Sequence, residues 1–274
     1  MVDLPINETK PYESNYHSGD FFNQFRTKIE EFYESERYFL NNDILKPNMT
    51  ILDIGCASGG LGNAITESIE SRVNYLGIDV DEKAIKLGEE KFPKLNLINQ
   101  SYPEGIKDKK FDMIIVFNLF EQITNWKEFL QSLVDHSNKF INIGLTLRMS
   151  GSTVIDKDIS YGYYFDSGIR VNKIIHNIYE LINFCCLEEM RVKKISFYGY
   201  HIDRPASIAS DFRPLPQKEQ IRGNLLLELF EKGRNKKRAG GFPNTETLKK
   251  MNLELEYIFR PNIEIIIDKK PFEL

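Results

Sequence analysis

The stretch ILDIGCASGGLG, residues 51–62, holds the side chains and the glycines best suited to binding a ligand. An apolar run carries Asp53, and four glycines follow within the same twelve residues. Glycines in such a turn let the backbone approach a ligand, because they have no side chain and tolerate left-handed conformations. In an open parallel sheet, a turn of this kind lies at the carboxyl end of a strand, where ligands bind.

Asp53 distinguishes between the two common ligands of such a turn, a dinucleotide and S-adenosylmethionine. A dinucleotide places its pyrophosphate at the helix N-terminus and is marked by G-x-G-x-x-G. Here Cys56 and Ala57 follow Gly55, so no G-x-G opens the turn. A carboxylate beside a pyrophosphate would also cost on the order of 1 kcal/mol or more where screening is poor. The sulfonium and ammonium of S-adenosylmethionine are cations, so Asp53 favours that cofactor.

A second acid, Asp79, ends the next apolar run, VNYLGIDV. A carboxylate at this place can accept hydrogen bonds from the ribose hydroxyls of a bound nucleotide. Both candidate cofactors contain a ribose, so Asp79 supports the interpretation only together with Asp53.

The motifs resemble those of the class I S-adenosylmethionine-dependent methyltransferases. ILDIGCASGG is similar to their first motif, GIDVDEKAI to the second, NQSYPEGI to the segment after the third strand, and FDMIIVFNLFEQITNW to the fourth-strand motif. The resemblance covers residues 45–145 and implies a Rossmann-like methyltransferase fold. The cofactor contacts that it implies come from Asp53, Gly55, Cys56, Ala57, Gly59, Asp79, Val80, Gln100, Ser101, Asn118, Leu119 and Phe120.

Two positions depart from the family pattern. Ala57 stands where many members have glycine, and we expect it to be tolerated because alanine fits an ordinary helix start. Gln100 or Ser101 replaces the usual acid near the adenine. Cys56 is expected to be a small packed residue of the turn rather than a nucleophile.

Apolar runs and helix-like segments alternate through the first half of the chain, which predicts an α/β fold with a doubly wound, mostly parallel sheet. A helix is expected over 18–40, where apolar and aromatic residues recur at helical spacing. A late strand and a final strand, antiparallel as the resemblance implies, bring the predicted sheet to seven strands. The expected strands are 50–54, 73–80, 95–99, 111–118, 139–145, 187–200 and 262–268, and the expected core helices are 60–70, 81–92 and 125–137.

The predicted organisation has four regions. Residues 1–45 form an arm and helical cap, 46–200 the cofactor-binding core, 201–256 an insertion that serves as a substrate lid, and 257–274 the final core strand. Within the core, residues 150–168 are expected to be a long loop over the cofactor, and 171–185 a helix.

Candidate acceptor-side residues lie after the fifth strand. His201, at the start of the insertion, is a candidate general base for a substrate hydroxyl, with a structural role as the alternative. Tyr161, Tyr163 and Tyr164 either stack on a sugar or ring, or hold their loop against the body. Arg148 either meets an anionic group or is solvated.

The insertion differs in charge from the rest of the chain. Residues 213–250 contain ten Lys and Arg against four Asp and Glu, whereas the whole chain has a net charge of −4. Such a local basic patch favours an anionic partner. A solvated surface loop explains it equally well. An RNA or protein methyltransferase that docks through this insertion and a non-catalytic cofactor-binding module therefore stay open as alternatives.

Composition narrows the function further. A pI near 5.7 disfavours general nucleic-acid affinity. The N-terminus has no signal-peptide pattern, no apolar run is long enough for a membrane helix, and the three cysteines have no disulfide or zinc spacing. We therefore expect a cytoplasmic enzyme without a metal motif. The predicted reaction transfers a methyl group to oxygen or nitrogen of a small molecule, such as a sugar or nucleotide-linked sugar, and leaves S-adenosylhomocysteine.

Overall fold

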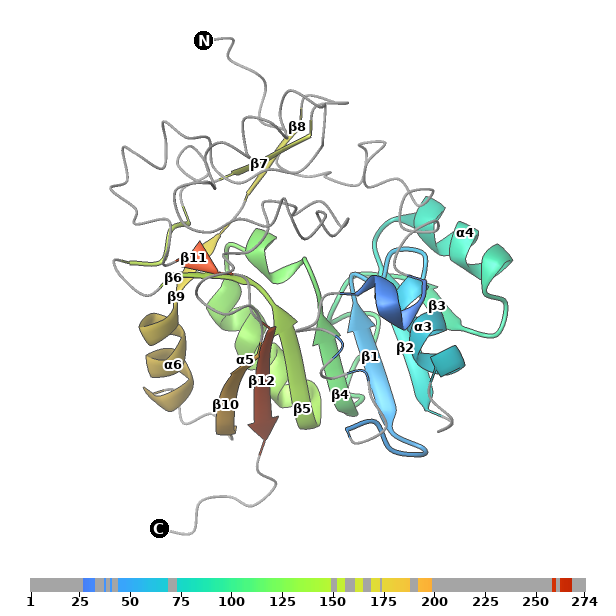
Figure 1. The fold of residues 1–274 in the computed structure, drawn as a ribbon, viewed down its shortest axis with the longest axis horizontal. Helices are drawn as coiled ribbons and strands as arrows, with labels where there is room; N and C mark the ends of the chain where they lie inside the picture. Colours follow the sequence, from blue (N-terminus) through green and yellow to red (C-terminus); the bar gives the residue numbers. More distant parts are fainter. Residues whose placement is uncertain are drawn as a thin grey trace.

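The computed structural model of the chain describes residues 27–32, 37, 40, 44–68, 73–148, 152–155, 161–164, 169–172, 174–187, 192–198, 258–259 and 262–267. A seven-stranded sheet lies at the centre of this part of the molecule, in the order β10-β12-β5-β4-β1-β2-β3 (Figure 1). Its strands are β1 (Thr50–Ile54), β2 (Asn74–Asp79), β3 (Asn96–Asn99), β4 (Phe111–Val116), β5 (Ser137–Gly144), β10 (Val192–Tyr198) and β12 (Asn262–Ile267).

Strands β1 to β5 run parallel to one another, and β12 runs antiparallel to both β5 and β10. The chain adds β2 and β3 on one side of β1 and then returns to place β4 on the other side. This reversal makes the carboxyl ends of β1 and β4 the place where a doubly wound sheet binds ligands. The predicted class, a doubly wound and mostly parallel α/β sheet, is confirmed.

Two apolar clusters cover the two faces of the sheet. On one face α3 (Gly60–Ser68), α4 (Glu82–Lys91) and the 3-10 helix η2 (Ile29–Glu31) pack over buried residues such as Met113 and Ile115. On the other face α5 (Trp126–His136) and α6 (Ile178–Leu187) pack over Ile114 and Val116. Residues of β4 alternate between the two clusters, because successive side chains of a strand point to opposite faces. This burial on both faces explains why β4 is apolar almost throughout.

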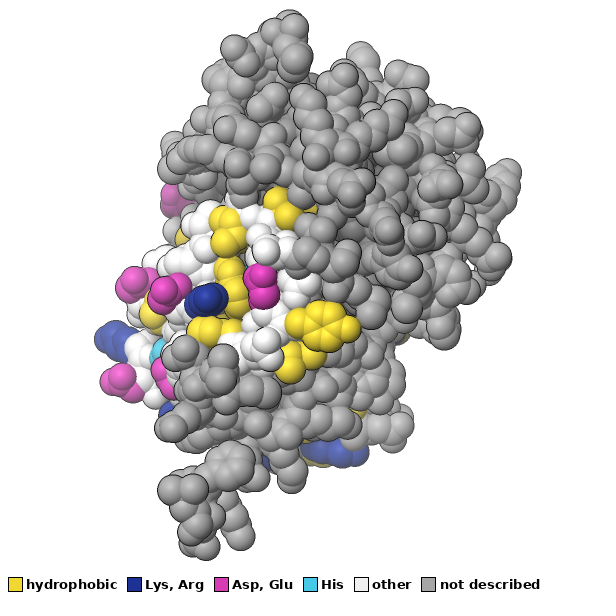
Figure 2. All heavy atoms as spheres, turned by 90° about the vertical axis from the view of Figure 1, so that its left-hand side faces the viewer, with side chains coloured by type: hydrophobic (Ala, Val, Ile, Leu, Met, Phe, Trp, Pro, Cys, Tyr) yellow, Lys and Arg dark blue, Asp and Glu magenta, His cyan; other side chains and the backbone are white. Residues whose placement is uncertain are grey.

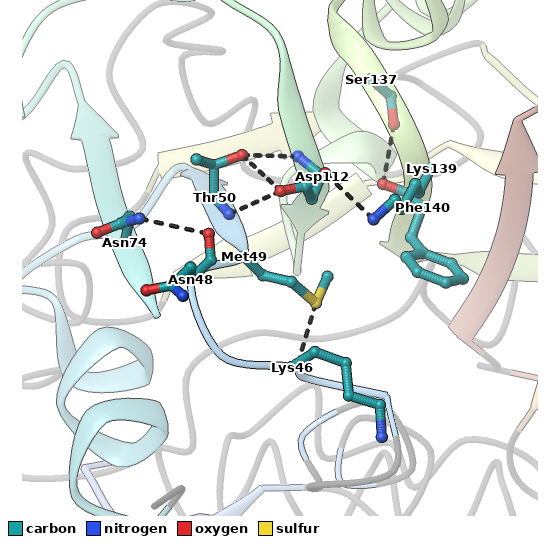
Figure 3. Close-up of polar contacts among 9 residues, drawn as sticks. All are labelled: Lys46, Asn48, Met49, Thr50, Asn74, Asp112, Ser137, Lys139 and Phe140. Atoms are coloured by element: carbon teal, nitrogen blue, oxygen red, sulfur yellow. Dashed lines mark hydrogen bonds and ion pairs between the residues drawn. The ribbon is translucent and has the colours of Figure 1, made fainter. Parts of the chain in front are cut away.

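Polar contacts join three strands at the end of the sheet where the parallel strands begin (Figure 3). The Thr50 backbone N–H and Oγ1–H donate to Asp112 Oδ2 at 3.0 and 3.1 Å, and the Asp112 N–H donates to Thr50 Oγ1 at 2.9 Å. Lys139 Nζ lies 3.6 Å from Asp112 Oδ1. These contacts hold β1, β4 and β5 together at their amino ends.

The predicted helix over 18–40 is interrupted within the described residues: Arg37 is helical, but 27–32 do not belong to an α-helix. Residues 29–31 form a single 3-10 turn, and Phe32 is extended, with φ −85° and ψ 155°. Phe32 is buried in the same cluster as α3, and Ile29 packs against that cluster. The apolar spacing of Ile29 and Phe32 therefore marks a contact with the core, and around these two residues tertiary packing favours a 3-10 turn over an α-helix.

The segment after β5 contains more strand than the sequence predicted. The expected loop over 150–168 holds β7 (Tyr161–Tyr164), and the expected helix over 171–185 begins with β8 (Ile169–Asn172) and β9 (Ile175–Asn177). Strands β7 and β8 form an antiparallel pair. β9, β6 (Thr146–Arg148) and β11 (Ile258–Phe259) form a three-stranded sheet. In Figure 1 both small sheets lie above the carboxyl ends of the parallel strands.

Asn177 accounts for the misplaced start of the helix. Its Oδ1 accepts hydrogen bonds from the backbone N–H groups of Tyr179 and Glu180, so α6 begins only after it. Asn177 and Glu180 have the spacing of a capping box, a signal that the sequence offered. The β-branched residues before Asn177 favour a strand.

None of the helices among the described residues is long and apolar enough to span a membrane. The predicted insertion, 201–256, lies outside the described residues, so its role as a lid stays a prediction, as do the region boundaries.

Candidate functional site

A cavity of about 430 Å³ opens at the carboxyl ends of β1, β2 and β4. Its volume falls in the range of small-molecule and cofactor sites. Four segments that follow strands supply most of its wall, and Phe32 and Phe129 complete it from η2 and α5. The lining residues are Phe32, Asp53, Ile54, Gly55, Cys56, Ala57, Gly60, Leu61, Ile78, Asp79, Val80, Asp81, Ala84, Gln100, Ser101, Tyr102, Phe117, Asn118, Leu119, Gln122, Ile123 and Phe129.

The glycine turn forms the floor of the cavity through a sequence of left-handed residues. Gly55 and Gly59 have φ of +76° and +79°, and Ala57 has φ of +48°. The backbone N–H groups of Gly55 and Cys56 donate to the carbonyl of Ile78, which ties the turn to β2. The expectation that Ala57 sits at an ordinary helix start is wrong, because α3 begins only at Gly60. Alanine pays a steric cost in this conformation that glycine does not.

Asp79 organises the rim of the cavity between β2 and α4. Its Oδ2 accepts the Ala57 N–H at 2.8 Å, and its Oδ1 accepts the Asp81 N–H at 2.9 Å. Burial raises the pKa of Asp79, while the N–H donors oppose the increase. A carboxylate has about four lone-pair sites, so these contacts orient Asp79 and leave capacity for a ligand hydroxyl.

Asp53 lies deeper in the same cavity and is only 3% exposed. The phenol of Tyr75, on the neighbouring strand β2, donates to Asp53 Oδ2 at 2.6 Å. Sequence reasoning missed Tyr75, because nothing in its local pattern distinguishes it from other apolar strand residues. The structure thus holds the acid that the sequence singled out against a buried donor.

The twelve predicted cofactor residues fall into two groups, those that line the cavity and those that do not. Ten of the twelve line the cavity, and Val80 is exposed at its rim. Gly59 and Phe120 do not line it. A Cβ on Gly59 would lie 3.1 Å from Leu95 and Leu97, and Phe120 is fully buried in the core cluster beneath α5.

Cys56 lines the cavity but is suited to packing rather than catalysis. Its Sγ would lie 2.8 Å from a Cβ added at Gly77. Burial raises the pKa of the Cys56 thiol, and Asp53 and Asp79 raise it further. A thiol in such surroundings stays protonated and is a poor nucleophile.

Several wall residues were absent from the sequence-based set. Asp81 is the N-cap of α4, where it accepts the Lys83 and Ala84 N–H groups. It follows β2 by two residues and also lines the cavity. Asp81, Tyr102 and Gln122 each stand within one of the motifs quoted for the family, and that position is the signal that could have found them. Phe129 lies beyond the fourth-strand motif and carries no such signal.

All charged side chains that line the cavity among the described residues are acidic. Asp53, Asp79 and Asp81 line the cavity, and no Lys, Arg or His occurs among the described residues that do so. Gly55 brings the backbone close, since a Cβ there would lie 3.2 Å from Leu119. Acidic side chains, a bare turn and an aromatic wall fit a cationic adenosine-containing molecule, and they do not fit a pyrophosphate.

The predicted acceptor-side residues are less fully placed. Arg148 lies on β6, opposite Ile258 of β11, and the three tyrosines lie on β7. Their side chains and all of His201 fall outside the described part, so these roles stay predictions. Within the described residues, no group of three His, Cys, Asp or Glu is arranged to hold a metal ion.

Comparisons with known proteins agree with this geometry. A family model described as a methyltransferase domain matches residues 52–139. A putative methyltransferase, 235L, of Invertebrate iridescent virus 6 is 24% identical over 202 residues, which are 69% of this chain and 74% of the viral protein. The ubiquinone biosynthesis O-methyltransferase of Rickettsia conorii is 29% identical over 107 residues, 38% of this chain and 35% of that protein.

A solved structure resembles the fold as well. Coclaurine N-methyltransferase, crystallised with N-methylheliamine and S-adenosylhomocysteine, superposes with a TM-score of 0.50 at 11% identity. The superposition covers 84% of this chain and 70% of that one. At this identity the likeness concerns the fold alone.

Proposed function

Because this chain belongs to the class I S-adenosylmethionine-dependent methyltransferases, we propose that it methylates an oxygen or nitrogen atom of a small molecule. The cofactor is S-adenosylmethionine. The proposal concerns the acceptor and the residues that bind each partner.

One observation carries the assignment of the cavity to this cofactor. Three carboxylates line it, and no basic side chain does so among the described residues. Carboxylates stabilise a sulfonium and an ammonium and destabilise a pyrophosphate. The same cavity would therefore bind NAD poorly, although both molecules contain adenosine.

The wall residues divide by the part of the cofactor that they suit. The floor at Gly55 and Ala57, with Asp53 beside it, would hold the methionine part. Asp79 would accept the ribose hydroxyls with the lone pairs that its two N–H donors leave. Val80, Leu119 and Gln100 or Ser101 would enclose the adenine.

The cofactor supplies a methyl group that its positive sulfur already activates for transfer to a nucleophile. The protein's task is then to orient the acceptor in line and to exclude water, which together contribute much of the rate. Phe117, Leu119 and Phe129 line the cavity with apolar side chains, which would exclude water from around a bound cofactor. A base is needed only for an acceptor that must lose a proton, such as a hydroxyl, and His201 remains the candidate for it.

Several observations support a small acceptor. The small sheets built by β6 to β9 lie over the sheet end that holds the cavity (Figure 1). On the face shown in Figure 2, acidic and basic side chains occur side by side among apolar ones, so the described part of that face has no patch of one sign. The rickettsial relative is an O-methyltransferase of ubiquinone biosynthesis, and coclaurine N-methyltransferase was solved with a small molecule bound. A sugar or nucleotide-linked sugar is the finer proposal, because the basic insertion would suit a phosphate.

Calorimetric titration tests the cofactor assignment. S-adenosylhomocysteine is titrated into the full chain, with NAD in parallel, and then into Asp79→Ala. Loss of two charge-assisted hydrogen bonds to ribose corresponds to about 3 kcal/mol or more, so we expect at least a 100-fold weaker affinity. Asp112→Asn is the matched control, since Asp112 lies on the same sheet at the opposite end of β4.

Binding of NAD equal to that of S-adenosylhomocysteine would contradict the assignment, as would an unchanged affinity in Asp79→Ala. The acceptor is then sought with radiolabelled methyl donor against a panel of sugars, nucleotide sugars, phenols, amines, RNA and protein. Methylation confined to RNA or protein would overturn the proposal of a small acceptor.

A further inference from the structure

Tyr75 is a buried tyrosine whose hydroxyl points at a charged residue of the cofactor cavity. It is 7% exposed and lies in the apolar cluster beneath α3. Its hydroxyl donates to Asp53 Oδ2 at 2.6 Å, a short distance typical of a hydrogen bond to an ionised acceptor. A phenylalanine would fill the same apolar space, so the hydroxyl has a role that packing alone does not explain.

The register of the sheet explains how the contact forms. Tyr75 pairs with Ile51 in the parallel β1–β2 ladder, and Asp53 pairs with Gly77, two residues further along. Because residues two apart on a strand share a face, the tyrosine ring extends along that face from the level of Ile51 to the level of Asp53. Gly77 has no side chain to obstruct it.

A glycine of α3 leaves room for the ring. A Cβ added at Gly62 would lie 2.5 Å from Cε1 and Cζ of Tyr75, much closer than a real contact. Glycine inside a helix costs about 0.5–1 kcal/mol relative to alanine. Gly62 lies where α3 packs against the tyrosine ring, so the ring requires a glycine there despite this cost.

We propose that Tyr75 is a positioning residue that orients the Asp53 carboxylate toward the ammonium group of the methionine part of the cofactor. The inference rests on the proposed function of the cavity and extends it to a residue outside the cavity wall. A carboxylate on a freely rotating side chain presents its oxygens in many directions. A donor fixed in the core at 2.6 Å selects one of them.

The Tyr75 hydroxyl can act as a hydrogen-bond donor over the whole physiological pH range. Burial raises the pKa of Tyr75 well above its ordinary value, and the neighbouring charge of Asp53 raises it further. Tyr75 therefore keeps its proton and stays a donor. The contact differs from that of Tyr102, which lines the cavity but shares its hydroxyl with Ser132 and His136.

The experiment compares two ligands that differ only in the part that Asp53 would bind. S-adenosylhomocysteine carries the amino-acid group, and 5′-methylthioadenosine has the same adenosine and thioether without it. Each is titrated calorimetrically into the wild-type chain and into Tyr75→Phe. We expect Tyr75→Phe to weaken S-adenosylhomocysteine by about 10-fold, in proportion to one hydrogen bond, and methylthioadenosine by less than about twofold.

Tyr102→Phe is the matched control, because it removes a tyrosine hydroxyl near the same cavity whose partners are Ser132 and His136 instead of Asp53. It should change both affinities by the same factor. A double-mutant cycle provides the second measurement, since Tyr75→Phe should have no further effect on S-adenosylhomocysteine in an Asp53→Ala background.

The outcomes separate the two proposals. A selective loss for S-adenosylhomocysteine, coupled to Asp53, supports the role of Tyr75. An equal loss for both ligands, or no loss, overturns it and leaves Tyr75 a packing residue while the cofactor assignment stands. A wild-type chain that binds neither ligand overturns the proposed function and this inference with it.

Discussion

Tyr75, on β2 of the seven-stranded sheet, and His176, on β9 of the three-stranded sheet, are two buried polar side chains with opposite surroundings. The Tyr75 hydroxyl donates to Asp53, next to the cofactor cavity. His176, on β9, is fully buried, and neither of its ring nitrogens has a hydrogen-bond partner within the described residues. The centroid of its ring instead lies 4.9 Å from the ring centroid of Phe120 and 5.3 Å from that of Trp126.

The difference reflects what each side chain faces. The hydroxyl of Tyr75 has a hydrogen-bond acceptor, the Asp53 carboxylate, which lines the cavity. His176 is surrounded by aromatic rings and serves as an apolar ring in the wall that supports η3 (Phe120–Gln122). Burial lowers the pKa of His176 to about 4, although Glu121 and the Phe120 backbone favour the protonated form. An unsatisfied buried group of this kind costs free energy that a satisfied one does not.

The largest expected effect is on the pH dependence of stability. His176 takes up a proton in the unfolded chain near pH 6.5 but in the folded chain only near pH 4. The contribution of neutral His176 to the free energy of unfolding is therefore complete above pH 6.5. It is lost as the pH falls toward 4, and the total loss is about 3 kcal/mol. Urea unfolding at several pH values measures this, and His176→Phe should remove that part of the slope. An identical slope in the variant would contradict the lowered pKa of His176 in the folded chain.

The next effect concerns the gap that the Tyr75 ring occupies. Gly62→Ala should destabilise the fold by about 2 kcal/mol, because the new Cβ overpacks against the ring, even though alanine is the better helix former. Thermal and urea unfolding measure the change. In a Tyr75→Leu background, which removes the ring, the same substitution should be neutral or stabilising. A destabilisation of equal size in that background would place the clash elsewhere.

A smaller effect compares the two polar groups directly. Tyr75→Phe should cost about 1–2 kcal/mol at pH 8, because it removes a hydrogen bond to a carboxylate. His176→Phe at the same pH should cost nothing or stabilise, because it removes a buried polar ring that has no partner among the described residues. Equilibrium unfolding in urea distinguishes the signs. Equal losses in the two variants would erase the contrast between these sites.

The smallest effect lies in the turn that connects Asp53 to α3. Ala57 has φ of +48°, so Ala57→Gly should relieve steric strain of about 1 kcal/mol. The greater freedom of glycine in the unfolded chain offsets part of this, leaving a gain below about 1 kcal/mol. Ala57→Val should instead destabilise, since a β-branched residue tolerates this conformation poorly. Thermal unfolding of the three chains gives the order, and a stabilised Ala57→Val would contradict it.

The structure brings together predicted residues that belong to short motifs at strand ends. Asp53, Gly55 and Asp79 line one cavity, and their contacts with the cofactor stay a prediction. The prediction is wrong beyond β5, where the expected helix over 171–185 contains the end of β8 and all of β9. The short apolar runs there have no clear period, and the capping residue Asn177 marks the start of α6 better than they do. Gly59 and Phe120 belong to the same motifs but do not line the cavity, since membership in a motif does not say which way a residue faces.

The sequence by itself determined the alternation of strands and helices, the glycine turn and the acids at the ends of the first two strands. These features depend on local conformational preferences and on apolar periodicity, which are written in neighbouring residues. Only the tertiary structure decided that Tyr75 donates to Asp53, that Gly62 leaves space for its ring, that Ala57 is left-handed and that His176 is buried among aromatic rings. Each depends on strand register and on packing between segments that are distant in the chain, because a side chain's partner is set by where the folded backbone places it.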